Sequence, residues 1–361
     1  MLFLSLNLRA NANDITNNNF ELVPNNYQQL REKIKEFTFF HLDNNDTNFS
    51  VIVTGKVLNN FTYKGFLNTT SEFEAPIIEQ YMKTIGKDYN ALNLRQYTVR
   101  KTVWNDGINI EKLNKFKLSF DIVWADSKDE VGKIDQFVKE TVNKLINEED
   151  DSYSKLLALH RFVVDNYQYD TNKDSPIHDT YELIINKKGV CSAYTGLFHK
   201  LIIQAGFNAR IIINNAYATD KNGTSSSHAW NLVELGGKYY HIDVTWDDPV
   251  TPFNINSPNL KYFLKSDAFM ENDHSWNRDL YEKANEKFNF NSMLNIGVEI
   301  FEPIINVSSK IKNELQNKAN NYELLANKPS NINFWVYLVG VLAFLYLFIS
   351  ISLLFKKKEN K

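Results

Sequence analysis

The chain has 361 residues, is 43% hydrophobic and 14% aromatic, and carries a formal net charge of −3. This apolar content is enough for a sizeable core and excludes a disordered chain, while the length suggests about two domains. The charge forms no basic stripe or acidic block, so we expect no nucleic-acid partner.

Residues 1–12 are interpreted as the remnant of a signal peptide. They begin with an apolar run and contain an Ala-x-Ala cleavage pattern from Ala10 to Ala12. Asn7 and Arg9 interrupt the apolar run, and no basic residues precede it. The segment therefore favours export of the chain without matching every feature of a signal peptide.

Residues 13–127 are predicted to form an N-terminal α+β module of unknown role. Two segments are expected to be helical, namely 27–36 and 71–86. Three segments rich in β-branched and aromatic residues favour strands, namely 49–58, 97–104 and 115–124. No motif with a recognisable chemical role occurs in this region.

Residues 128–280 are predicted to form a second α+β domain. Apolar residues at helical spacing predict helices at 129–146, 153–170, 178–186 and 191–205. Strands are then expected at 209–218, 228–235 and 238–246. Helices followed by antiparallel strands indicate a core in which the helices pack on one face of the sheet.

The C-terminal part is predicted to be a segment and stalk (281–332), a transmembrane helix (333–355) and a basic cytoplasmic tail (356–361). Phe334 to Phe355 contains no charged residue, and at ~1.5 Å per residue it spans about 33 Å, enough for a hydrocarbon core of ~30 Å. Three lysines follow at once, so the positive-inside rule places the preceding residues outside the cell. We therefore expect a single-pass protein of the cell membrane with an extracellular catalytic domain.

Three other interpretations of this apolar segment are a buried core helix, a cell-wall sorting signal and a tail anchor on an intracellular protein. A core helix is rarely apolar on every face. The Leu-Pro-x-Thr-Gly type of motif expected before a sorting signal is absent. The tail anchor depends on whether residues 1–12 are a signal peptide.

Cys191 is the single cysteine of the chain and stands in the first turn of a predicted helix. It lies three residues before Tyr194 on the apolar face, so the thiol should point toward the packed side of the helix. Unpaired N–H groups and the helix dipole favour an anion there. A cationic neighbour is still required to make a thiolate at neutral pH.

A predicted hairpin supplies that neighbour. If Gly236 and Gly237 form a two-residue loop, Trp230 faces Asp243 and His228 faces the residue two positions later, Thr245. His228 and Asp243 are then diagonal neighbours on one face of the sheet, within reach of a side-chain hydrogen bond. A three-residue loop would move Asp243 to the other face.

These residues form a candidate catalytic triad. Cys191 would be the nucleophile, His228 would take and return its proton, and Asp243 would orient the imidazole. The backbone N–H of Cys191 could contribute to an oxyanion hole. Each residue also has a structural interpretation, as a core cysteine, a satisfied histidine or a turn residue.

His241 lies on the same strand face as Asp243 and is an alternative base. A metal site built from Cys191, His228, His241 and Asp243 is conceivable, but no short ligand spacing supports it. We therefore expect no metal and no cofactor.

Three blocks of this sequence resemble the transglutaminase-like superfamily, specifically its bacterial cysteine-protease-like branch. They are GVCSAYTGLFHKLIIQAGFNARIIINN, SSHAWNLVELGGKYYHIDVTWDDP and YFLKSDAFMENDHSW, within residues 128–280. The resemblance implies a papain-like transglutaminase core, in which helices pack on an antiparallel sheet, with catalytic Cys191, His228 and Asp243. It also implies that Tyr194, Trp230, Asn231 and Trp246 line the substrate site or support the motif.

The resemblance implies a thiol enzyme that attacks carboxamides and passes the acyl group to water or to an amine. We expect a peptide or protein substrate, such as cell-wall peptide, and favour hydrolysis because nothing in the sequence indicates how water would be excluded from a thioester. The alternatives are transglutaminase crosslinking and a surface binding or scaffold protein without turnover. No acidic cluster indicates the calcium sites of the animal crosslinking enzymes.

Overall fold

The structure is a computed structural model that describes residues 15–62, 65–66, 73–105, 112–172, 174–248 and 260–289. The chain divides into two compact units, Met1–Phe288 and Asn289–Lys361, and everything below concerns the first. In the described ranges, no helix combines the length and apolar character needed to cross a membrane. The predicted signal peptide, transmembrane helix and basic tail, and the stalk after residue 289, lie outside these ranges.

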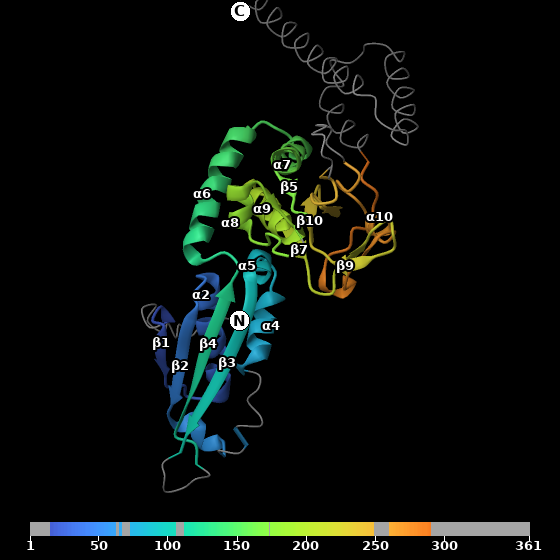
Figure 1. The fold of residues 1–361 in the computed structure, drawn as a ribbon. Helices are drawn as coiled ribbons and strands as arrows, with labels where there is room; N and C mark the ends of the chain where they lie inside the picture. The colour runs from blue at the N-terminus through green and yellow to red at the C-terminus, as the bar shows by residue number, and fades with distance from the viewer. Residues whose placement is uncertain are drawn as a thin grey trace, which may run out of the picture. The chain divides into compact units, whose positions relative to one another are not determined.

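The N-terminal region contains a four-stranded sheet with the order β1-β2-β4-β3. Its strands are β1 (Asn19–Leu22), β2 (Asn48–Thr54), β3 (Leu94–Trp104) and β4 (Lys115–Trp124). β1 is parallel to β2, whereas β2 and β3 pair antiparallel with β4. The strands predicted at 97–104 and 115–124 are confirmed, and β3 and β4 form the long ribbon in Figure 1. The strand predicted at 49–58 ends at Thr54, because Lys56–Asn60 forms a 3₁₀ helix.

Helices cover this sheet and complete an apolar core. They are α2 (Tyr27–Asp43), α4 (Ala75–Met82) and α5 (Asp88–Asn93), with the 3₁₀ helix η1 (Lys56–Asn60). α2 continues seven residues beyond the predicted end, because Phe37 and Leu42 extend the buried stripe that begins at Leu30 and Ile34. The Asn26 side chain caps its start.

The second region begins with four helices in a row. They are α6 (Lys128–Leu145), α7 (Ser152–Asn166), α8 (Thr180–Asn186) and α9 (Cys191–Gln204). Ser127 and Glu130 form a capping box at α6, and Asp151 caps α7. α9 contacts the other three helices and the strands β7 and β10, so it lies at the centre of this region (Figure 1).

A three-stranded antiparallel sheet with the order β11-β10-β7 packs against α9. Its strands are β7 (Ala209–Ile212), β10 (Trp230–Leu235) and β11 (Lys238–Ile242). Leu235 pairs with Lys238, so the predicted hairpin register is correct. Gly236 and Gly237 have φ values of 61° and 76°, which is the left-handed conformation that a two-residue hairpin loop requires.

The predicted strand at 209–218 is correct at its two ends but divides into two strands, because the chain turns in its middle. Asn214 and Asn215 adopt left-handed φ values of 58° and 62°, which asparagine tolerates better than most residues. The residues that follow enter another three-stranded sheet, with the order β12-β8-β9. Its strands are β8 (Tyr217–Thr219), β9 (Ser225–Ser227) and β12 (His274–Ser275).

Short elements complete the mixed α+β fold. They are the parallel pair β5 (Gln168–Tyr169) and β6 (Lys188–Gly189), the helix α10 (Asp267–Met270) and the 3₁₀ helix η3 (Arg278–Leu280). The described part of the predicted 281–332 segment packs on the second region, since the Ala284 carbonyl accepts the Asp267 N–H at 2.7 Å.

Two buried carboxylates of the N-terminal region contact the second region, one at α8 and one at β7. Asp126 accepts hydrogen bonds from the Tyr89 hydroxyl at 2.9 Å and from the N–H groups of Thr180 and Tyr181. Asp88 pairs with Arg210 at 2.9 Å. Asp126 thus holds the start of α8, the helix that leads into β6 and Cys191.

Candidate active site

Cys191 occupies the first position of α9. Val190 precedes it with an extended backbone, and no side chain caps this helix end. The exposed N–H groups and the dipole at such an end favour a negative charge. Cys191 is a free and partly exposed cysteine, so its sulfur can meet a molecule from solvent.

Gly189 determines how closely the chain packs just before Cys191. A Cβ at Gly189 would lie 3.0 Å from both Ala193 Cβ and Leu183 Cδ1, and 3.2 Å from the Ile177 carbonyl oxygen. The same carbonyl accepts the N–H of Val190 at 2.8 Å. This close packing fixes the backbone that presents the thiol.

His228 lies between β9 and β10, two residues before the hairpin begins. Its N–H donates to the Ala216 carbonyl at 2.9 Å. One residue later, the Ala229 carbonyl accepts a hydrogen bond from the Thr195 hydroxyl on α9 at 2.9 Å. The segment that carries His228 is therefore attached directly to the helix that carries Cys191.

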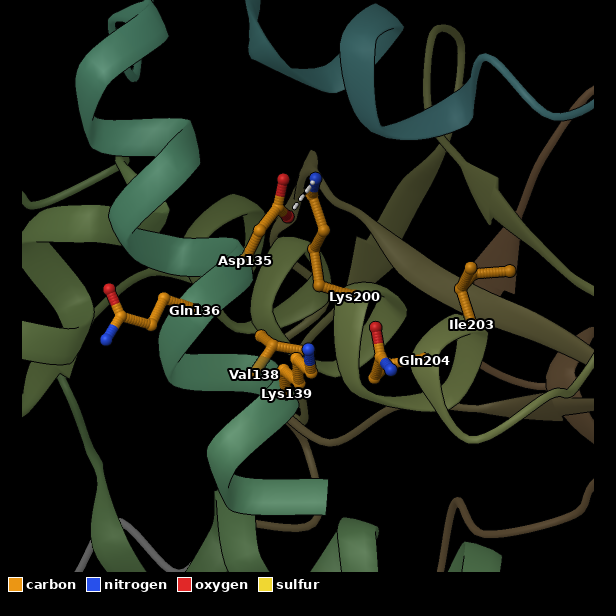
Figure 2. A pocket seen from close by; sticks show the side chains of 7 residues that line it. All are labelled: Asp135, Gln136, Val138, Lys139, Lys200, Ile203 and Gln204. Atoms are coloured by element: carbon orange, nitrogen blue, oxygen red, sulfur yellow. Dashed lines mark hydrogen bonds and ion pairs between the residues drawn. The ribbon is translucent and has the colours of Figure 1, made fainter. Parts of the chain in front are cut away.

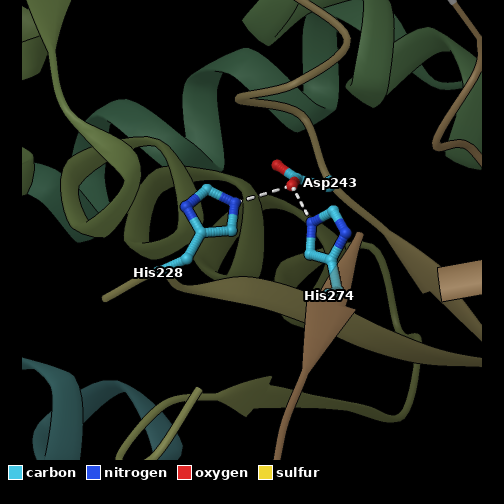
Figure 3. Close-up of side chains that lie close together, drawn as sticks. All are labelled: His228, Asp243 and His274. Atoms are coloured by element: carbon cyan, nitrogen blue, oxygen red, sulfur yellow. Dashed lines mark hydrogen bonds and ion pairs between the residues drawn. The ribbon is translucent and has the colours of Figure 1, made fainter. Parts of the chain in front are cut away.

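Asp243 follows β11 directly and is fully buried, with a side chain that is 0% exposed. Its Oδ1 accepts the backbone N–H groups of Thr245 at 3.0 Å and Trp246 at 3.1 Å. Its Oδ2 lies 2.7 Å from His228 Nε2 and 3.1 Å from His274 Nε2 (Figure 3). The structure brings His228 and Asp243 together as the hairpin register predicted, although the strand pairing ends before Asp243.

The pKa values of this pair move in the directions expected for an ion pair. Burial by itself lowers the pKa of His228, but the charge of Asp243, its hydrogen bond and a hydrogen bond with the Cys191 side chain raise it to about 10. Burial by itself raises the pKa of Asp243, but His228 and His274 lower it below its ordinary value. The geometry thus favours a charged imidazolium between a carboxylate and a sulfur.

The two ring nitrogens of His228 have different neighbours. Nε2 is bound to Asp243, so Nδ1 is the nitrogen left for the hydrogen bond with Cys191. An imidazolium beside a sulfur at a helix N-terminus is the environment that activates a cysteine as a nucleophile. The structure therefore brings Cys191, His228 and Asp243 into one chain of contacts.

Comparison with known proteins identifies this part of the chain. Residues 139–244 match the model of the transglutaminase-like superfamily, a range that includes Cys191, His228 and Asp243. This part of the chain is a transglutaminase-like domain. The curated relatives include kyphoscoliosis peptidase of human, 26% identical over 148 residues, and of mouse, 25% identical over 150 residues.

These alignments cover 37% and 38% of this chain but only 22% and 23% of the two relatives, so the chain matches less than a quarter of their length. Among solved structures, a candidate cysteine protease from Cytophaga hutchinsonii has a TM-score of 0.27 and 14% identity, covering 45% of this chain and 68% of that one. The periplasmic domain of TgpA from Pseudomonas aeruginosa has a TM-score of 0.24 and 13% identity, covering 43% and 73%. Similarities this remote do not assign residue roles.

Three of the four expected substrate-lining residues of the transglutaminase-like domain are structural in this structure. Tyr194, Trp230 and Asn231 are each 0% exposed, so no substrate can touch them. The Tyr194 hydroxyl donates to Asp248 at 2.6 Å, and the Trp230 indole N–H donates to His241 at 2.9 Å. Of the two roles that the resemblance implied, lining the site or supporting the motif, these three residues take the structural one, because tertiary packing buries them in the core.

His241 does not take the position of an alternative base. Its Nδ1 accepts from Trp230, and its Nε2 lies 2.8 Å from Asp267 Oδ1, so both ring nitrogens are used away from the thiol. With both nitrogens bound elsewhere, His241 is also not free to bind a metal ion together with Cys191, His228 and Asp243.

Within the described residues, the cluster with the geometry to hold a metal ion is His228, Asp243 and His274, whose ligand atoms lie within 4.8 Å of one another. Both histidines direct Nε2 at the same carboxylate oxygen, and hydrogen bonds at 2.7 and 3.1 Å explain the cluster. The arrangement does not require an ion, and we derive no step through one.

Sequence analysis missed two residues of this site. His274 comes from β12, which pairs with β8 through His274 and Ala218, and no local pattern indicates this pairing. Tyr169 lies in β5 opposite Gly189 and is 36% exposed. Burial raises the pKa of Tyr169, and the charges of Cys191 and Asp243 raise it further, which places this phenol within the electric field of the site.

A groove of about 620 Å³ adjoins the site on the side of Trp246. It is lined by Thr219, Asp220, Lys221, Trp246, Lys261, Tyr262, Asn272 and Asp273. The Trp246 ring lies 5.8 Å from the His228 ring and 4.7 Å from the His274 ring. Trp246, the fourth expected lining residue, is thus the one that both borders open space and contacts the histidines.

A second groove, of about 560 Å³, lies between α6 and α9 (Figure 2). Its lining includes Asp135 and Lys200, which pair at 2.7 Å. Lys200 and Gln204 stand at the C-terminal end of α9, nine or more residues after Cys191, so at ~1.5 Å per residue this groove is at least about 13 Å away along the helix. It is therefore separate from the candidate active site.

Proposed function

We propose that this protein is a cysteine-dependent acyl-transfer enzyme that acts on peptide or side-chain amides and releases the acyl group to water. The observation that carries the proposal is the position of His228, which binds a fully buried carboxylate through Nε2 and so leaves Nδ1 for the Cys191 side chain, whose hydrogen bond helps to raise the pKa of His228. A histidine fixed in this way can act as a general acid and base, because its free nitrogen faces the reacting groups.

The reaction proceeds in two halves. The sulfur of Cys191 attacks the amide carbon, and the oxyanion faces the backbone N–H of Cys191 at the start of α9. The His228 imidazolium then gives its proton to the leaving nitrogen, and the C–N bond breaks to leave a thioester. Neutral His228 next takes a proton from water, whose oxygen attacks the thioester and frees Cys191.

Asp243 keeps His228 in place through both halves. Its Oδ1 is fixed by two backbone N–H groups, so its Oδ2 points at His228 without needing to reorient. A pre-oriented carboxylate stabilises the imidazolium in the resting state and selects the ring nitrogen that faces the sulfur. The papain-like arrangement expected from the sequence is the one that this geometry supports.

The groove beside Trp246 is our proposed position for part of the peptide substrate. It offers an indole, two lysines and two aspartates next to the histidines, which suits an extended chain with amide and charged groups. Crosslinking to an amine remains the second candidate, because it uses the same thioester. A non-catalytic binding protein with this fold is the third.

We also propose that the C-terminal apolar segment anchors the protein in the cell membrane, with this domain outside, where cell-wall peptide would be an accessible substrate. Two sequence features support this, the uncharged run from Phe334 to Phe355 and the three lysines after it. Finding a mature N-terminus near residue 13 on cell-surface protein would support it, and finding an unprocessed intracellular chain would contradict it.

The first test is the rate at which iodoacetamide labels the full-length chain between pH 5 and 10, compared with the His228→Ala variant. Cys191 is the single thiol, so the label reports on this site alone. We expect labelling well below pH 8 in the native protein and a midpoint near the free-thiol value of about 8.5 in the variant. Identical profiles would contradict the proposal.

Ammonia release from glutamine peptides, measured with and without a primary amine, then separates the reactions. Ammonia without amine incorporation, or new peptide termini from backbone cleavage, indicates hydrolysis, and incorporation indicates crosslinking. Reactive labelling without ammonia, cleavage or incorporation across peptide libraries would favour the binding protein.

A further inference from the structure

The buried side chain of His274 lies in direct contact with the carboxylate that orients His228. Its Nε2 lies 3.1 Å from Asp243 Oδ2, the oxygen that also binds His228. Its Nδ1 lies 2.7 Å from Asp273 Oδ1. The ring therefore bridges two carboxylates, one inside the candidate site and one at the edge of the Trp246 groove.

The His274 ring has little freedom to turn. Its side chain is 0% exposed, and its ring centroid lies 4.9 Å from that of Trp230, 4.7 Å from that of Trp246 and 5.4 Å from that of Tyr262. These rings fix the plane of the imidazole, and the two carboxylates fix the direction of its nitrogens.

The side chain of Asp273, the carboxylate at the edge of the groove, is also fixed by its neighbours. Asp273 Oδ2 accepts a hydrogen bond from the Tyr262 hydroxyl at 2.5 Å, and Lys261 lies 3.8 Å away. A line of contacts thus runs from Asp273 through His274 and Asp243 to His228 and on to Cys191.

Backbone pairing brings these distant residues together. His274 pairs with Ala218 in β8, and β8 pairs through Tyr217 with Ser227, the residue before His228. The β12-β8-β9 sheet therefore places the two histidines side by side, with ring centroids 5.5 Å apart (Figure 3).

We propose that His274 is a positioning residue of this site, which, with Asp273, holds Asp243 Oδ2 where it can bind His228. The proposal rests on the proposed function and names a further member of the same site. His274 touches neither the sulfur nor a substrate in this role, and it acts only through Asp243.

The physical reason is that a buried carboxylate stays ionised only while hydrogen-bond donors surround it. Asp243 receives four hydrogen bonds, from His228, His274 and the N–H groups of Thr245 and Trp246. Because Asp243 is held as a carboxylate, it can only accept, so His274 Nε2 must donate. Removing that donor frees one side of Oδ2 and disfavours the ionised carboxylate.

The test compares two substitutions at one position. His274→Phe keeps an aromatic ring but removes the donor, whereas His274→Gln places an amide N–H near the position of Nε2. The readout is the pH dependence of iodoacetamide labelling of Cys191 in the full-length chain, with thermal unfolding measured beside it. The titratable groups in contact with the histidine pair are Asp243, Asp273 and Cys191, and His241 lies farther away with both ring nitrogens bound elsewhere.

For His274→Phe we expect the labelling rate of Cys191 at neutral pH to fall about tenfold. The lowest pH at which labelling is detected should rise by about one unit, because Asp243 protonates more readily. His274→Gln should recover most of both effects. Asp273→Asn should shift the profile in the same direction by less, since it removes only the outer contact.

His241→Phe is the matched control. His241 is as deeply buried, lies in the same aromatic cluster and contacts an aspartate, but it does not touch Asp243. We expect it to lower thermal stability without moving the labelling profile.

Two results would overturn the inference. If folded His274→Phe has the native profile, or if His274→Gln and His274→Phe are equally impaired while both are folded, His274 is only a packing residue. The proposed function would then survive, provided that His228→Ala alters labelling. If His228→Ala has no effect either, both the function and the inference are wrong.

Discussion

A buried histidine–aspartate pair occurs both in the N-terminal region and in the transglutaminase-like region, and the two pairs are alike in distance. His41 Nδ1 lies 2.7 Å from Asp46 Oδ2, and His228 Nε2 lies 2.7 Å from Asp243 Oδ2. The second nitrogen distinguishes them. The His41 Nε2 has no hydrogen-bond partner among the described residues, whereas the second nitrogen of His228 meets the side chain of Cys191.

The surroundings of the two histidines explain this difference. The His41 ring stacks on Phe49 with centroids 4.6 Å apart and fills part of an apolar core. His228 instead lies between the buried carboxylate of Asp243 and the side chain of Cys191, a partly exposed residue at a helix N-terminus. A short histidine–aspartate contact is therefore no sign of catalysis by itself, and the neighbour of the other nitrogen decides what the pair can do.

The largest expected effect comes from removing the nucleophile that only the second region has. Cys191→Ala should abolish acyl-enzyme formation, a loss of about 10⁴-fold or more in amide turnover. The partly exposed thiol adds little to the core, so thermal unfolding should change slightly. Mass spectrometry for a covalent acyl adduct checks this, and an adduct on the variant would exclude Cys191 as the nucleophile.

Substituting each histidine by alanine shows directly which of the two pairs is needed for turnover. His228→Ala should lower turnover about 100- to 1,000-fold, because the sulfur loses its proton partner. His41→Ala should leave turnover unchanged but lower the free energy of unfolding by about 2–3 kcal/mol through a cavity and the lost contact with Asp46, which keeps its ion pair with Lys128. Turnover and urea unfolding on both variants test the comparison, which fails if His41→Ala is the less active protein.

Substituting the aspartate of each pair tests the same comparison, with a smaller expected loss of turnover. Asp243→Asn should reduce turnover by about 100-fold or more, because a neutral amide neither stabilises the imidazolium nor selects its tautomer. Asp46→Asn is the matched change beside His41 and should leave turnover as it is. Equal activity of the two variants would show that Asp243 supports only the fold.

The stability of the protein should depend on pH through the histidine of the transglutaminase-like region. The pKa of His228 is raised from about 6.5 to about 10, so the folded state binds more protons than the unfolded state between these values. The resulting stability is fully present below pH 6.5 and is lost as pH rises through 10, by at most about 1.4 kcal/mol per pH unit. Urea unfolding of native protein and His228→Asn over this range should show the steeper fall in the native protein, and parallel curves would contradict it.

The smallest effect concerns two glycines of the transglutaminase-like region. Gly189→Ala should cost about 1–3 kcal/mol and slow labelling of Cys191, because its Cβ would press on Ala193, Leu183 and a carbonyl oxygen. Gly132→Ala in α6 meets nothing within 4 Å and should stabilise the protein by about 0.5–1 kcal/mol. Thermal unfolding measures both, and a neutral Gly189→Ala would show that the backbone before Cys191 can adjust.

The sequence by itself determined those parts of the site that depend on local spacing. The apolar period places Cys191 at the start of a helix, and two adjacent glycines set the register that brings His228 near Asp243. These features follow from residues close together in the chain, where helical period, alternation and turn chemistry operate.

Tertiary structure alone decided the rest. The contact between His274 and Asp243 joins residues far apart through strands of two and three residues, too short to show any pattern. The burial of Tyr194, Trp230 and Asn231 likewise depends on which elements pack against them, not on their own neighbours in the chain. Local sequence determines the direction and pairing of single elements, whereas the set of side chains that surrounds a reactive group depends on how distant elements meet.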